Sequence, residues 1–126
     1  MSSSIVFHGY HHDGSNSLIE YILDLCIREF DQVEGCQSES DLKTFFQNYR
    51  DSFFSGLYVF LDDDDIPYPS DALFLADLFE RVFVLLQQPD SELTDHGRTT
   101  VATRLVPLVE RLRKYATGTL PHSNEA

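Results

Sequence analysis

The chain has 126 residues, of which 42% are hydrophobic and 13% aromatic, and its formal net charge is −12. That length and hydrophobic content exclude a compositionally disordered chain and suit a single domain with its own core. No apolar run approaches the roughly 18 residues of a membrane-spanning helix. The N-terminus lacks the basic start and long apolar middle of a secretion signal. We therefore expect a cytoplasmic protein.

The charge is unevenly distributed along the chain. Residues 1–95 hold nineteen Asp and Glu against four Lys and Arg, a net charge of −15, whereas residues 96–126 carry +3. Such an acidic body repels nucleic acid over most of its surface, so direct DNA or RNA binding is not expected. It attracts basic proteins and accelerates their association. A basic protein is the partner class that the composition favours.

Residues 1–16 contain one short apolar run, Ile5–Phe7, followed by histidines and glycines. We predict a loop here that could contain a short extended piece. Ser17 and Glu20 have the spacing of a capping box. Apolar residues then recur with a helical period as far as Val33, and Gly35 is a suitable stop, so a first helix is predicted from Ser17.

The second predicted helix begins after Ser40 and keeps an apolar helical period through Phe45, Phe46 and Phe53. The same period continues to about Leu61, so one helix could reach that residue. A glycine interrupts it, and Gly56–Leu61 could instead be a short separate helix or a strand.

A third helix is predicted from an N-cap at Ser70 to about Gln88. It is apolar around most of its circumference, which indicates a central position or an interface that could hold a homodimer. The fourth helix is predicted over Thr94–Ala116, with a kink or break near Thr103–Val106 because Pro107 lies inside it.

These patterns predict an all-α fold, a compact bundle of four to five helices with a kinked last helix. Residues 1–126 are expected to form a single helical domain with an N-terminal loop over 1–16 and a frayed tail over 118–126.

Histidines in the N-terminal segment raise the question of a metal site. His8, His11 and His12 lie close together with Asp13, and His8 and His12 have i,i+4 spacing. That spacing places two ligands together only on a helix, and the neighbouring glycines argue against one. A polar surface loop is the better interpretation, and no metal or cofactor is predicted.

The most unusual stretch of the chain is four consecutive carboxylates between its two most apolar runs: Asp62, Asp63, Asp64 and Asp65. A calcium loop of the EF-hand type needs alternating oxygen ligands and a glycine at its sixth place, whereas Ile66 and Pro67 follow here. Either a solvated surface or a docking loop explains the run. The nearby Tyr58 and Tyr68 favour docking, because aromatic side chains beside acids are effective anchors.

No nucleophile elbow, phosphate-binding glycine loop or paired-cysteine motif is present in the sequence, so we do not expect an enzyme. The leading hypothesis is an acidic inhibitor or immunity-type protein that neutralises a basic partner, such as a bacterial nuclease toxin. A second acidic stripe on the first helix offers another docking face: Glu20, Asp24 and Asp31. Two alternatives are a nucleic-acid mimic that blocks a DNA- or RNA-binding defence protein, and a helical dimerisation or adaptor module.

Overall fold

The computed structural model describes residues 2–54 and 56–118, and these form an α+β fold. The strands are β1 (Ser2–Phe7), β2 (Tyr10–Ser15) and β3 (Tyr58–Leu61). The helices are α1 (Asn16–Glu29), α2 (Glu39–Asp51), α3 (Pro69–Leu86) and α4 (Asp95–Ala116), with short 3-10 helices η1 (Phe30–Gln32) and η2 (Asp63–Asp65). The predicted all-α bundle is therefore wrong.

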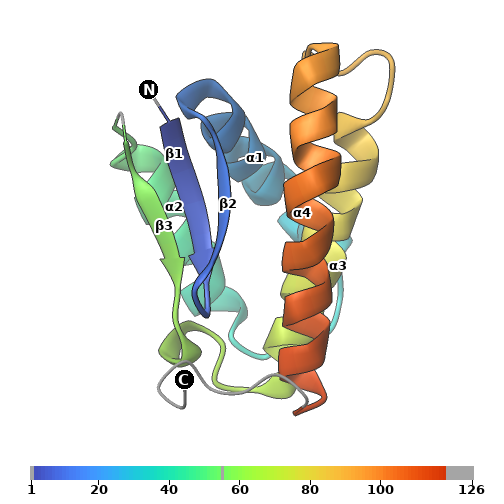
Figure 1. Cartoon of the computed structure of the whole chain (residues 1–126). Helices are drawn as coiled ribbons and strands as arrows, with labels where there is room; N and C mark the ends of the chain where they lie inside the picture. The colour runs from blue at the N-terminus through green and yellow to red at the C-terminus, as the bar shows by residue number, and fades with distance from the viewer. Residues whose placement is uncertain (1, 55, 119–126) are drawn as a thin grey trace.

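The first sixteen residues, predicted to be a loop, form the β1–β2 hairpin (Figure 1). Its turn is His8-Gly9, with φ angles of 48° and 78°. Positive φ at both central residues matches a two-residue turn to the right-handed twist of antiparallel strands. β2 is mostly polar, so it lacks the composition of a typical strand. Pairing with β1, where Ile5 lies opposite His12, stabilises β2 as a strand although its own residues have low strand propensity.

The segment Gly56–Leu61, for which the sequence allows a helix or a strand, contains the strand β3. α2 ends at Asp51 and does not continue to Leu61. Gly56 has a φ of 82°, which no α-helix accommodates. β3 then pairs in parallel with β1, with Tyr58 opposite Ser4. The strand order β2-β1-β3 leaves β2 and β3 at the two edges of the sheet.

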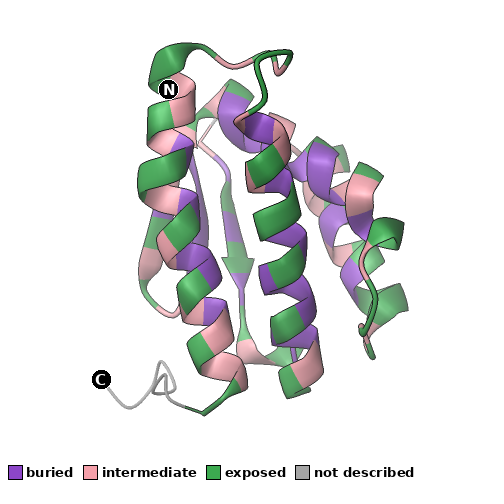
Figure 2. Ribbon diagram, turned by 90° about the vertical axis from the view of Figure 1, so that its right-hand side faces the viewer, coloured by how far each residue is buried: buried purple, intermediate pink, exposed green. Residues whose placement is uncertain are grey.

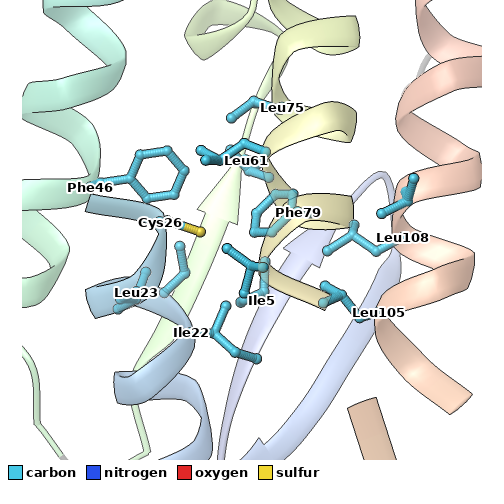
Figure 3. Packing of buried hydrophobic residues seen from close by; sticks show 14 of the residues in the cluster. Ile5, Ile22, Leu23, Cys26, Phe46, Leu61, Leu75, Phe79, Leu105 and Leu108 are labelled. Carbon is cyan, nitrogen blue, oxygen red and sulfur yellow. The ribbon is translucent and has the colours of Figure 1, made fainter. Parts of the chain in front are cut away.

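The helices cover one face of this sheet, and α4 lies beside β2 (Figure 1). Figure 2 shows buried residues on the inward sides of the helices and exposed residues toward the solvent. Ile5 of β1, Ile22 and Cys26 of α1, and Phe79 of α3 meet in the shared core (Figure 3). No helix in the described part of the chain covers the opposite face of the sheet.

α3 is the central helix, and its apolar circumference is buried within the monomer. Its buried side chains pack against α1 and α4. The central position predicted for this helix is thus confirmed, and only Leu73 and Val84 among its large apolar residues are exposed. No helix within residues 2–54 and 56–118 has the length and apolarity to cross a membrane.

The helix starts were predicted with mixed success. Ser15, not Ser17, caps α1, since its hydroxyl accepts the Leu18 amide at 3.1 Å. α3 begins at Pro69, one residue before the predicted cap at Ser70. α4 was predicted to run from about Thr94, and Thr94 is its N-cap residue, one position before the first helical residue.

Pro107 does not break α4, which continues from Asp95 to Ala116 (Figure 1). Pro107 removes one backbone donor, but Leu105 and Leu108 on either side of it are fully buried in the core. Tertiary packing therefore holds the helix through the proline. The predicted break is wrong, and the alternative, a kink near Thr103–Val106, stays a prediction. Of the predicted frayed tail, residues 119–126 lie outside the described residues.

Candidate docking surface

The four consecutive carboxylates form a compact turn: Asp63–Asp65 are the 3-10 helix η2, and Asp62 is its N-cap residue. The Asp62 amide donates to the Asp65 carboxylate at 2.9 Å, and the Asp62 side chain accepts the Asp65 amide in return. This is a reciprocal capping box. The pKa of Asp65 lies above its ordinary value, first because burial disfavours its charged form and then because Asp62 and Asp64 repel it.

Asp63 joins this turn to the β1–β2 hairpin. Its carboxylate lies 2.6 Å from the His8 imidazole Nε2, whose side chain is only 4% exposed. Tyr115 at the end of α4 also hydrogen-bonds Asp63, and its ring packs against His8 at 5.1 Å between centroids. Three elements far apart in the sequence therefore meet at η2. Asp63 is structural, whereas Asp62 and Asp64 are exposed.

Exposed aromatic side chains gather in β3 and its flanks. The exposed fractions are 45% for Tyr58, 46% for Phe60, 61% for Phe54 and 49% for Tyr68. Tyr58 and Phe60 are both on the sheet face that the helices leave uncovered, because Val59 and Leu61 between and after them are buried in the core. Their ring centroids lie 5.9 Å apart.

The uncovered face of the sheet continues from β3 across β1 to β2. Register places Val6 between Phe60 and His11, and Ser4 between Tyr58 and Asp13. The His11 ring packs edge-on against Tyr58 at 6.0 Å.

We define the β3 surface as Tyr58, Phe60, Asp62 and Asp64, two exposed rings followed by two exposed carboxylates along one strand and its turn. Tyr68, also predicted as an anchor, follows this turn immediately before α3. Phe60 was missed by sequence reasoning. The signal that could have found it is the short run Tyr58-Val59-Phe60-Leu61, rich in aromatic and β-branched residues and bounded by Gly56 and the aspartates.

The second predicted acidic face is arranged differently. Glu20 and Asp24 both pair with Arg50 of α2, and Asp31 pairs with Lys43 at 2.7 Å. These bases lie across the α1–α2 contact, so the stripe is largely neutralised by the chain's own cations. It presents less uncompensated charge than the β3 surface does.

Glu20 and Asp24 also line a cleft of about 710 Å³ between the start of α1 and the start of α4. Arg104, His96 and Glu92 lie on its other walls. α1 and α4 both begin at the end of the molecule opposite η2 (Figure 1). The cleft and the β3 surface are therefore separate regions.

The histidines that raised the question of a metal site are dispersed by the hairpin. His8 packs against Asp63, His11 lies on the uncovered sheet face, and His12 is buried in the core side of β2. Among the described residues, no group of three or more His, Cys, Asp or Glu side chains is arranged to hold a metal ion.

Comparison with protein-family models, with curated proteins and with solved structures finds no match for this chain. Its function is therefore inferred from its own geometry.

Proposed function

We propose that this protein binds and neutralises a basic partner protein, as an inhibitor or immunity-type protein, and that the β3 surface is where the partner docks. The observation that carries the proposal is the juxtaposition of half-exposed Tyr58 and Phe60 with exposed Asp62 and Asp64 in a chain of net charge −12. The role requires no chemistry from the protein itself.

The two halves of this surface serve different steps of binding. Exposed acids steer a cationic protein toward the surface and raise its association rate. Aromatic rings supply the buried contact area that slows dissociation, and tyrosine is among the residues enriched at binding hot spots. Tyr58 and Phe60 come from a strand, so their positions are fixed before the partner arrives, which reduces the entropy lost on binding.

A nuclease toxin is the partner class that fits this chemistry best. A nuclease must hold phosphates, so its active-site cleft is basic. An acidic surface with aromatic anchors can occupy such a cleft and exclude the nucleic acid. The contact between Asp63 and His8 joins η2 to the hairpin, so the exposed Asp62 and Asp64 lie on a folded turn with its own capping box.

Neither rival hypothesis gains support from a specific observation. A nucleic-acid mimic needs a long row of uncompensated acids, but many acids of this chain pair with its own bases, including Glu20, Asp24 and Asp31. A helical adaptor needs an exposed apolar helix, but the apolar side chains of α3 are mostly buried in the core.

The proposal is tested by affinity purification of the full chain from its own cells with three matched variants. The double variants Tyr58→Ser/Phe60→Ser and Asp62→Asn/Asp64→Asn each change half of the β3 surface. Asn at position 62 still accepts the Asp65 amide, so the turn is retained. The control, Asp90→Asn/Glu110→Gln, removes two exposed acids elsewhere.

We expect a basic protein to co-purify with the wild-type chain and with the control, and to be reduced at least about tenfold with either surface variant. Adding purified wild-type protein should then suppress the nuclease activity of the captured protein in a one-to-one ratio. Capture that is equal for all four chains, or a captured protein without excess positive charge, would contradict the proposal.

A further inference from the structure

The outer edge of β3 presents backbone hydrogen-bonding groups as well as side chains. In a parallel ladder, alternate residues of a strand direct their N–H and C=O groups to one neighbour and the residues between them to the other side. The Ser4 amide donates to the Leu57 carbonyl at 3.0 Å, so the odd-numbered residues of β3 face β1. The N–H and C=O groups of Tyr58 and Phe60 therefore point away from the sheet.

The two edge strands of the sheet, β2 and β3, differ in what packs beside them. α4 packs alongside β2, where the Tyr10 hydroxyl donates to the Arg104 carbonyl at 2.8 Å (Figure 1). At the β3 edge, one side chain within residues 2–54 and 56–118 hydrogen-bonds an outward-facing backbone group: the Phe60 N–H donates to the Tyr49 hydroxyl at a long 3.3 Å, in an exposed position. That oxygen occupies the place where the carbonyl of an added strand would accept.

Charge decides what kind of strand can use this edge. Natural sheets usually block an edge with lysines, prolines or bulges. Here the residues that follow the strand are Asp62 and Asp64, so a second copy of this chain, itself at net charge −12, is repelled. A segment rich in Lys or Arg is attracted instead. The β3 edge therefore favours pairing with a strand that carries positive charge.

We propose that the basic partner contributes an extended segment that adds to β3 as a fourth strand, giving the order β2-β1-β3-partner. This inference rests on the proposed function and specifies its docking mode. The added backbone pairs with Tyr58 and Phe60. Its apolar side chains lie beside these two rings, and its lysine or arginine side chains reach Asp62 and Asp64.

A pair of synthetic peptides tests this mode of binding. The first alternates lysine and valine, so it is cationic and forms a strand readily. The second, of equal length and charge, alternates lysine and proline and cannot pair along a sheet edge, because proline lacks the N–H donor. Each is titrated into the isotope-labelled full chain at physiological salt, and amide hydrogen exchange is followed by NMR.

The lysine–valine peptide should slow exchange of the Tyr58 amide at least about tenfold, and the lysine–proline peptide should leave it unchanged. Asp62→Asn/Asp64→Asn should weaken binding of the first peptide. Tyr49→Phe should strengthen it, because the hydroxyl that occupies the Phe60 N–H is removed. Sedimentation of the free chain should give the monomer mass.

Each other outcome overturns strand addition in a recognisable way. Equal binding of both peptides without protection of Tyr58 means that docking is by charge and side chains alone, and the proposed function stands. Binding of neither peptide excludes a basic strand as the occupant, while the capture experiment still decides the proposed function. A dimer in sedimentation, with Tyr58 protected before any peptide is added, assigns the edge to a second copy.

Discussion

The buried carboxylate of Asp71, in the first turn of α3, binds the backbone at the start of α2. It accepts the Ser38 amide at 3.0 Å, and also the Ser38 hydroxyl at 2.7 Å and the Gln37 amide at 2.8 Å. Ser38 is the N-cap residue of α2, but its own side chain makes no capping bond. A carboxylate from another helix therefore does the capping, with a favourable sign at the positive end of the helix dipole.

Replacing Asp71 with alanine should destabilise the protein by about 3 kcal/mol or more, because two backbone amides lose a charged acceptor in a buried position. Urea denaturation measures the loss. Asp77→Ala is the matched control on the same helix, because Asp77 is exposed and its ion pair with Arg113 should contribute less than about 1 kcal/mol. Equal losses for the two variants would show that Asp71 does not cap α2.

His12 should make the protein sensitive to mild acid. Its ring is fully buried, and neither ring nitrogen has a hydrogen-bond partner among the described residues. Burial lowers the pKa of His12 to about 4, from 6.5. The unfolded chain therefore binds this proton more readily than the folded one. Stability is complete above pH 6.5 and falls as pH decreases toward 4, by about 2 kcal/mol between pH 7 and pH 5.

Urea denaturation as a function of pH checks this expectation with two variants. Both His12→Leu and His12→Gln should flatten the profile between pH 7 and pH 5, since neither side chain titrates. His12→Gln should be less stable than His12→Leu at every pH, because it buries an amide. If the variants and the wild-type chain give parallel profiles, His12 is not the group responsible.

The start of α1 offers a direct comparison of two serines. Ser15→Ala should cost about 1 kcal/mol, because the Ser15 hydroxyl accepts the Leu18 amide. Ser17→Ala should change stability by less than about 0.5 kcal/mol, since Ser17 is an exposed residue inside the helix. Thermal unfolding monitored by circular dichroism suffices for both, and a larger loss for Ser17→Ala would restore the capping box predicted from the sequence.

Neighbouring carboxylates in η2 should respond differently to the same substitution. Asp63→Ala removes the contacts to His8 and Tyr115 and should cost about 1 to 2 kcal/mol. Asp64→Ala should leave stability unchanged or slightly higher, because it relieves repulsion within the turn. Both variants remove one charge, so unfolding in urea at fixed ionic strength separates the contact from the charge. Equal losses would mean that Asp63 does not anchor the turn.

The sequence was sufficient for the helices that carry their own signal. α1, α3 and α4 were predicted because apolar residues recur along each of them with the helical period. The sheet was missed for the opposite reason. β2 is polar, and β3 has only four residues and follows a helix whose apolar period continues into it. Both strands depend on partners distant in sequence, which local patterns do not report.

The helical period wrongly assigned to residues 56–61 also explains why Phe60 was missed at the candidate site. On a helix Phe60 shares a face with Leu57 and Leu61, so it was counted as an inward residue. On a strand it shares a face with Tyr58 instead. The pairing of Glu20 and Asp24 with Arg50 was equally hidden, because it depends on how α1 packs against α2. Asp62 and Asp64 were predicted because adjacent carboxylates must stay in water, and Tyr58 was predicted because it lies near them in the sequence.

The parallel pairing of β1 with β3 also has a consequence for biosynthesis. Ser4 and Tyr58 lie opposite each other although more than fifty residues separate them along the chain. On the ribosome, the β1–β2 hairpin can close as soon as it emerges, but the other side of β1 must wait until β3 has been translated. During that interval, the apolar run Ile5–Phe7 is open to chaperones and to stray strands from other nascent chains.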